Sequence, residues 1–231
     1  MALLGLDEFY RMALPSRRGE GRLAALAGAC ALLTVLAENR VIPLMALTLL
    51  VLAFCLIALF RLQEIRQAAA DAALILMGFL YVPLLLSHLV MIRLLPHGVS
   101  WLFLIMVIVM SGDSAAYYVG STFGKTKIYP PVSPKKSVEG SLGGLAGSLV
   151  GAFVSKGLFF PELTVFDCIA TALLLGVLGQ LGDLFESLIK RSCGVKDSGT
   201  IIPGHGGILD RLDSILFAGP AAFYYAYFLL R

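Results

Sequence analysis

Long apolar stretches alternate with short polar connections along the whole chain. The clearest stretch is Val41–Phe60, twenty residues without one charged side chain, and about 20 apolar residues cross the ~30 Å hydrocarbon core of a bilayer. The pattern therefore predicts an all-α fold, a polytopic transmembrane helical bundle of about seven spans. We expect them at Leu23–Ala37, Val41–Phe60, Ala72–Leu94, Ser100–Gly120, Ser141–Leu158, Phe166–Ile189 and Ser214–Leu230.

The first of these spans, Leu23–Ala37, is short and has two interpretations. It is a cleaved signal sequence if Val35-x-Ala37 serves as a small-x-small cleavage site. It is one arm of a helical hairpin if it pairs with the second span. The connection Glu38–Arg40 has only three residues, which favours the hairpin.

Composition supports a membrane protein over a soluble helical core. Hydrophobic residues make up 58% of the chain and charged residues 14%, with a mean hydropathy of +0.88, whereas soluble domains are about 25% charged. We therefore expect a lipid bilayer as partner and no nucleic acid.

The four cysteines, Cys30, Cys55, Cys168 and Cys193, are scattered without a C-x-x-C pair. We therefore expect them to pack as small apolar side chains.

The basic residues predict the orientation of the spans. With seven spans and a cytoplasmic N-terminus, 14 of the 18 Lys and Arg residues lie on the cytoplasmic side, as the positive-inside rule requires. The other four are Arg40, Arg93, Lys156 and Arg231. The long polar loops then all face the cytoplasm. We therefore expect a multi-pass protein of the inner (cytoplasmic) membrane whose active site faces the cytoplasm.

The end of the sixth predicted span carries charged residues on one helix face. Asp183, Glu186, Ser187 and Lys190 follow one another at i, i+3, i+4 and i+7. Glycines at positions 176, 179 and 182 precede them and would let a second helix or a ligand approach closely. A solvated helix end is the structural alternative, but Asp183 lies several residues inside the basic end of the span, where a charge usually has a function.

A glycine-rich loop follows this span. Gly204, Gly206 and Gly207 surround His205, and their backbone N–H groups can point at phosphate oxygens. The carboxylates of Asp210 and Asp213 come next. With Asp183 they could hold Mg²⁺, which prefers oxygen ligands. Two basic residues supply positive charge for the same phosphates (Lys196 and Arg211).

A third polar region begins with Asp113, a carboxylate inside the fourth predicted span. The loop after it, residues 124–140, holds four lysines, a Ser-Pro-Lys-Lys-Ser run and Glu139. Its lysines alone could be orientation signals. Together with the carboxylates they describe a polyanion site, and the matching reaction class is phosphoryl or nucleotidyl transfer, where catalysis rests on positioning and charge neutralisation.

The residues from Ser187 to Asp213 resemble a known signature. The run Ser187-x-x-Lys-Arg, Lys196-Asp-x-Gly, Ile202-Pro-x-His-Gly-Gly-x-x-Asp-Arg-x-Asp213 is similar to the signature of phosphatidate cytidylyltransferases. Asp113–Tyr117, Gly124-Lys125 and Ser133–Lys136 resemble upstream blocks of that family. The resemblance divides the chain into N-terminal transmembrane helices (1–110) and a catalytic transmembrane domain (111–231).

This resemblance implies an Mg²⁺-dependent transfer of CMP from CTP to phosphatidic acid, which yields CDP-diacylglycerol and diphosphate. It implies a metal centre of Asp183, Asp210 and Asp213, with K⁺ as a further ion. The catalytic set it implies is Asp183, Asp210, Asp213, Lys190, Arg191, Lys196 and Arg211. The substrate-binding set is Asp113, Ser133, Lys135, Lys136, Ser137, Glu139, Glu186, Ser187, Asp197, Pro203, His205, Gly206 and Gly207.

The chain departs from the family pattern in two places, and rival functions stay open. Ser137 and Val138 stand where the family usually has threonine and an aromatic residue. About two N-terminal spans fewer than in a typical family member are also expected, which leaves the interface of a homodimer open. The rivals are a polyprenol or archaeal-lipid cytidylyltransferase, a CTP-dependent lipid kinase, an anion transporter and a non-catalytic scaffold. A transporter would spread its charges through the bilayer depth, whereas these carboxylates gather toward one side.

Overall fold

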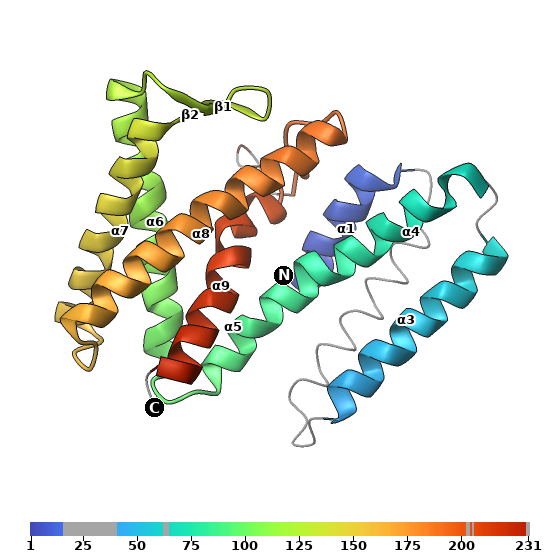
Figure 1. The fold of residues 1–231 in the computed structure, drawn as a ribbon, viewed down its shortest axis with the longest axis horizontal. Helices are drawn as coiled ribbons and strands as arrows, with labels where there is room; N and C mark the ends of the chain where they lie inside the picture. The colour runs from blue at the N-terminus through green and yellow to red at the C-terminus, as the bar shows by residue number, and fades with distance from the viewer. Residues whose placement is uncertain (16–40, 62–64, 202–203, 205, 230–231) are drawn as a thin grey trace. The chain divides into compact units, whose positions relative to one another are not determined.

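The computed structural model describes residues 1–15, 41–61, 65–201, 204 and 206–229 (Figure 1). The predicted span Leu23–Ala37 and the predicted site residues Pro203 and His205 lie outside the described residues.

Helices form at the other six predicted spans. In chain order they are α3 (Val41–Arg61), α4 (Ile65–Phe79) with the π-helical turn η3 (Leu80–Leu84) and α5 (Leu85–Arg93), α6 (Gly98–Phe123), α7 (Val138–Leu158), α8 (Val165–Ser192) and α9 (Leu209–Leu229). Within the described residues, four helical segments are long and apolar enough to cross a membrane: Arg66–Arg93, Gly98–Phe123, Val138–Leu158 and Val165–Ser192. The predicted all-α membrane fold is confirmed, while the total of seven spans and their orientation stay predictions.

The chain forms two compact units. The first comprises Met1–Ser87 and Asp197–Leu209, and the second comprises His88–Lys196 and Asp210–Arg231. The glycine-rich part of the signature, Asp197–Leu209, is called the motif loop below, and it belongs to the first unit. The predicted functional boundary near residue 110 is a separate matter and stays a prediction.

The first unit contains a helix that the sequence pattern did not predict, α1 (Ala2–Ala13). Its apolar face is buried, with Leu6 and Phe9 fully enclosed. The hydroxyl of Tyr10 donates a hydrogen bond of 2.7 Å to the carbonyl oxygen of Ile75 in α4. Gly78 makes this packing possible, because a Cβ there would lie 2.7 Å from the Phe9 ring. Helix α1 is therefore fixed on α4 within its own unit.

Helices α6 and α7 of the second unit pack through small residues. A Cβ added to Gly147 would lie 2.6 Å from the carbonyl oxygen of Ser111, and one added to Gly112 would lie 2.5 Å from the Ser148 hydroxyl. That hydroxyl donates to the carbonyl oxygen of Ile108 at 3.1 Å. Glycine and serine therefore let the two backbones approach closely, as is common between membrane helices.

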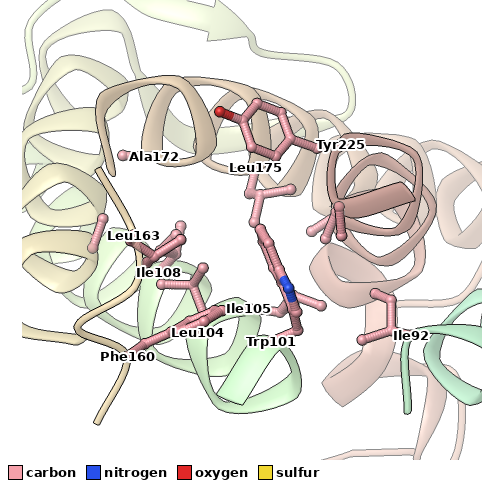
Figure 2. Packing of buried hydrophobic residues seen from close by; sticks show 14 of the residues in the cluster. Ile92, Trp101, Leu104, Ile105, Ile108, Phe160, Leu163, Ala172, Leu175 and Tyr225 are labelled. Carbon is pink, nitrogen blue, oxygen red and sulfur yellow. The ribbon is translucent and has the colours of Figure 1, made fainter. Parts of the chain in front are cut away.

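An apolar cluster holds α6, α8 and α9 together at one end of the second unit (Figure 2). Trp101 meets Phe160 edge to face, with ring centroids 5.3 Å apart. Thr164 and Asp167 form a capping box at the start of α8. The Tyr225 hydroxyl of α9 donates to Asp167 at 2.6 Å. This end is thus fixed by aromatic packing and a buried hydrogen bond.

A β-hairpin occupies the lysine-rich loop, where the sequence predicted no strand. Strand β1 (Lys127–Tyr129) pairs antiparallel with β2 (Ser133–Ser137), and Lys127 is opposite Ser137. Ser137 caps α7 by accepting a hydrogen bond from the Gly140 amide at 3.1 Å. Glu139 accepts hydrogen bonds from the amides of Lys125 and Thr126, both at 3.1 Å. These two predicted substrate-binding residues therefore fix the hairpin to the start of α7.

Candidate active site

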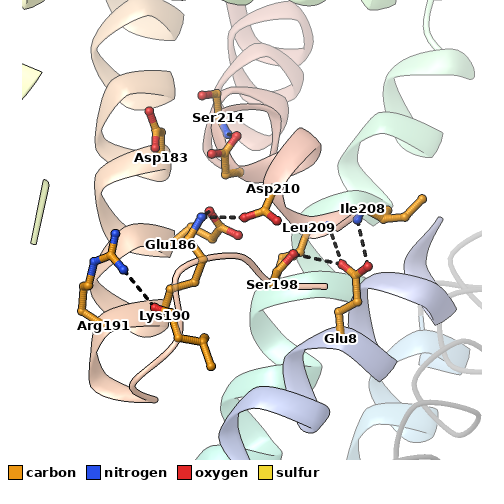
Figure 3. Close-up of polar contacts among 12 residues, drawn as sticks. Glu8, Asp183, Glu186, Lys190, Arg191, Ser198, Ile208, Leu209, Asp210 and Ser214 are labelled. Carbon is orange, nitrogen blue, oxygen red and sulfur yellow. Dashed lines mark hydrogen bonds and ion pairs between the residues drawn. The ribbon is translucent and has the colours of Figure 1, made fainter. Parts of the chain in front are cut away.

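A buried cluster of alternating charges lies on α8 and at the start of α9 (Figure 3). The Lys190 Nζ lies 2.6 Å from a carboxylate oxygen of Glu186 and 2.6 Å from one of Asp210. Glu186 is fully buried, and the side chain of Lys190 is 11% exposed. Glu186 and Lys190 are one turn apart, which confirms that they share a helix face.

The glycines that precede this cluster let α9 lie against α8, as their spacing predicted. A Cβ on Gly182 would lie 2.5 Å from the carbonyl oxygen of Asp213, and one on Gly179 would lie 3.6 Å from the Ser214 side chain. The first turns of α9 can therefore place their carboxylates beside those of α8. The Asp213 side chain also accepts a hydrogen bond from the Ser214 amide at 2.7 Å.

Strand β2 contributes a second lysine to this region. Lys136 forms an ion pair of 2.9 Å with Asp183 of α8, and both side chains are partly exposed. Neighbouring residues of a strand point to opposite faces, and Lys135 is accordingly exposed. Of the two predicted lysines, Lys136 is the one that the structure brings to the carboxylates.

Further carboxylates converge on this place. Asp183, Glu186 and Asp113 lie within electrostatic range of Asp213, so acidic side chains of α6, α8 and α9 are near enough to influence one another. Charges taken out of water need counter-charges nearby. Lys136 and Lys190 supply them within the protein through their ion pairs.

The predicted metal ligands have the oxygen chemistry that Mg²⁺ prefers. Among the residues that the structure describes, no three His, Cys, Asp or Glu side chains form a group arranged to hold a metal ion. Asp183 is paired with Lys136, and Asp210 with Lys190. The residue types fit the ion, and the metal centre of Asp183, Asp210 and Asp213 stays a prediction.

The other predicted cations are exposed, unlike Lys190. Arg191 donates hydrogen bonds to the carbonyl oxygen of Val195 at 3.1 Å and to that of Val132 at 3.4 Å. It thereby connects the end of α8 to the hairpin. Lys196 and Arg211 are exposed, while Ser133 and Ser187 are partly buried. Each of these five residues stays a predicted site residue.

The motif loop in the first unit contains the remaining predicted residues. Asp197 is exposed, and Gly206 adopts φ 80°, a conformation that favours glycine. Gly207 is buried against the carboxylate of Glu8. The sequence interpretation assigned Gly207 to phosphate binding and did not single out Glu8.

Glu8 is the polar residue that sequence reasoning missed. It is fully buried in α1, and its carboxylate accepts hydrogen bonds from the Ser198 hydroxyl (3.1 Å), the Ile208 amide (2.9 Å) and the Leu209 amide (2.8 Å) (Figure 3). A local signal was present, because Glu8 shares the buried face of α1 with apolar residues. An acid on the apolar face of an amphipathic helix indicates a specific buried partner.

Comparison with known proteins identifies the family of the chain. The family described as "Cytidylyltransferase family" matches residues 1–229. The chain belongs to this family. The membership confirms the resemblance found in the signature from Ser187 to Asp213.

Curated relatives of this cytidylyltransferase-family protein carry a common name, phosphatidate cytidylyltransferase. The protein from Staphylococcus haemolyticus is 36% identical over 95% of this chain and 84% of its own length. The one from Bacillus subtilis is 42% identical over 69% of this chain and 58% of its own length. The one from Staphylococcus saprophyticus is 39% identical over 75% of this chain and 66% of its own length. The chain thus spans about three fifths to two thirds of the length of two of these relatives.

Proposed function

We propose that this protein is a phosphatidate cytidylyltransferase, which transfers CMP from CTP to phosphatidic acid and releases diphosphate. The observation that carries the proposal is the cluster of acidic side chains and two lysines on α8, α9, α6 and β2. Such a cluster on membrane helices suits a lipid substrate whose head group is a phosphate. The shared name of the relatives supports phosphatidate over the other lipid phosphates.

In the proposed reaction, an oxygen of the phosphatidate phosphate attacks the α-phosphorus of CTP. The bond from that phosphorus to the oxygen bridging to the β-phosphate breaks, and diphosphate leaves with its electrons. The protein needs no covalent nucleophile, because the substrate phosphate already is one. Its contribution is to bring two polyanions together and to neutralise their charge.

The structure suggests how the side chains share this work. Lys190 holds Glu186 and Asp210 in place through two contacts of 2.6 Å. Lys136 does the same for Asp183 at 2.9 Å. The exposed Lys196 and Arg211 are placed to attract the triphosphate.

Mg²⁺ would be held by Asp183, Asp210 and Asp213, with K⁺ as a further ion in the same acidic region. When bound, the divalent ion supplies charge neutralisation for the phosphates of CTP. We further propose that the protein lies in the bacterial inner membrane with this site facing the cytoplasm, where CTP is found. The charge bias of the loops supports that orientation.

An assay with purified protein tests the proposed function. The protein is incubated in detergent with CTP labelled at the α-phosphate, Mg²⁺ and phosphatidic acid, and the lipid fraction is counted. We expect a labelled lipid, its loss with EDTA, and a large loss with Asp183→Asn. The matched control is Glu162→Gln, an exposed acid between α7 and α8, which we expect to keep wild-type activity.

The outcome separates the rival functions. No labelled lipid from the wild-type protein would overturn the proposed reaction. Label transferred to a polyprenyl phosphate in preference to phosphatidic acid would assign a different lipid substrate. Use of CTP labelled at the γ-phosphate, with that label entering the lipid, would indicate a lipid kinase.

A further inference from the structure

The carboxylate of Glu8 joins the two ends of the motif loop. Ser198 is the second residue of the loop, and Ile208 and Leu209 are its last two, yet all three donate to this one side chain. Glu8 Oε2 accepts from Ser198 and Leu209, and Oε1 accepts from Ile208. A single buried group thus closes a loop of about ten residues, as the hydrogen-bonded stem of a hairpin would.

Two glycines of the motif loop make room for this carboxylate. A Cβ on Gly199 would lie 2.6 Å from Glu8 Oε1, and one on Gly207 would lie 2.4 Å from Oε2. Any larger side chain at either position would push the carboxylate away from its donors. Both glycines belong to the signature run, so part of that run is explained by contact with α1.

The contacts described for Glu8 also suit a negative charge. Leu209 is the first residue of α9, and the amides at the start of a helix have no partner within the helix. A carboxylate there accepts these hydrogen bonds and is favoured by the helix dipole. All three hydrogen bonds described for Glu8 come from neutral donors. The carboxylate is therefore stabilised by the direction of these N–H and O–H groups and not by a paired cation.

Helix α1 is a firm support for this side chain. Phe9 and Leu6 are fully buried beside Glu8, and Tyr10 is fixed to α4 by its hydrogen bond to Ile75. Burial raises the pKa of the Tyr10 hydroxyl, so it stays protonated and continues to donate. The backbone that carries Glu8 is therefore held against α4 by its neighbours in the helix.

We propose that Glu8 is a positioning residue of the nucleotide-binding loop, through which α1 holds the two ends of the loop at Ser198 and at Ile208–Leu209. The proposal rests on the proposed function, because the family resemblance assigns the glycines and His205 of this loop to CTP. Glu8 contacts no reacting atom itself. It acts by holding the ends of the loop in place for the binding of the triphosphate.

Glu8→Gln is the sharpest variant. The amide keeps the size of the side chain but replaces one acceptor oxygen by an NH₂ donor. In either orientation of the amide, at least one backbone N–H of Ile208 or Leu209 then faces a donor. We expect kcat/KM for CTP to fall by about 10-fold to 100-fold, the range expected when a binding group is misplaced by up to ~1 Å. The KM for phosphatidic acid should stay near the wild-type value.

Asp7→Asn is the matched control, since it makes the same acid-to-amide change one residue away. Asp7 pairs with Arg11 at 2.7 Å on the partly exposed side of α1. We expect this variant to keep the wild-type KM for CTP. Gly199→Ala is the second test variant, because it displaces the same carboxylate without altering its charge, and it should also raise the KM for CTP.

Hydrogen exchange distinguishes positioning from general stability. In Glu8→Gln, amides of residues 198–209 should exchange faster, while those of α6 and α8 keep their wild-type rates. Faster exchange over the whole chain, or a CTP dependence equal to that of Asp7→Asn, would overturn the proposal. A wild-type protein that labels no lipid would instead overturn the proposed function, and the exchange experiment would still test the role of Glu8.

Discussion

Replacing Lys190 by methionine removes the cation that lies between two buried carboxylates. Its Nζ lies 2.6 Å from Glu186 and 2.6 Å from Asp210, so those two oxygens are at most twice that distance apart. The side chains of Glu186 and Asp210 are 0% and 8% exposed, so water screens them little. Methionine fills a similar volume, and the variant therefore tests charge rather than packing.

The expected loss follows from this geometry. Two unit charges about 5 Å apart repel by about 3 kcal/mol at an effective dielectric constant of about 20. Removal of one partner from a buried ion pair costs about 3–5 kcal/mol. For a chain of this size, this corresponds to a fall in Tm of about 6–20 °C. We therefore expect Lys190→Met to be folded at low temperature and clearly less heat-stable.

The single tryptophan provides the assay. Trp101 is 3% exposed in the core of the same unit, so its fluorescence in detergent reports the unfolding of that unit. The double variant Lys190→Met with Glu186→Gln should regain most of the lost Tm, because one buried charge is then gone. Lys127→Met, an exposed lysine of β1, should change the Tm little. A wild-type Tm in Lys190→Met, or a double variant less stable than the single one, would refute this reasoning.

Two further pairs of variants test the site and the packing. Lys136→Ala should lower kcat/KM by about 10-fold, because Asp183 loses its ion pair. Lys135→Ala, on the exposed side of the same strand, should lower kcat/KM less. Equal losses in the two variants would contradict the pairing of Lys136 with Asp183. Gly147→Ala should lower stability by about 1–3 kcal/mol, since its Cβ would lie 2.6 Å from a backbone oxygen of α6. Gly157→Ala, with nothing within 4 Å of the added Cβ, should raise the Tm slightly, because alanine favours a helix.

Hydrophobic patterning predicted the helices well because a membrane span is a local property. The span predicted from Ala72 matches the continuous stretch from α4 to α5, although α4 begins earlier, at Ile65. The pattern could not show the π-helical turn at Leu80–Leu84. That turn contains Pro83, which has no N–H for the helical ladder, and such turns depend on how the backbone is packed.

The charged face of α8 was also predictable, since spacings of three and four residues need only helix geometry. The partners of its residues were not predictable in the same way. Whether Lys135 or Lys136 meets Asp183 depends on the hairpin, and a loop with Pro130, Pro131 and Pro134 gave no strand signal. The family resemblance assigned Ser137 and Glu139 to substrate, and in the structure both side chains accept hydrogen bonds from backbone amides.

The contacts of Glu8 have a consequence for biosynthesis. Its donors follow it by 190 to 201 positions in the chain, and a ribosome adds about 5–20 residues per second. The first unit therefore waits roughly 10–40 s for its last segment, with an acid on the apolar face of α1 that has yet to meet its hydrogen-bond donors. Assembly of the N-terminal unit thus becomes a late event, completed only when the motif loop has been made.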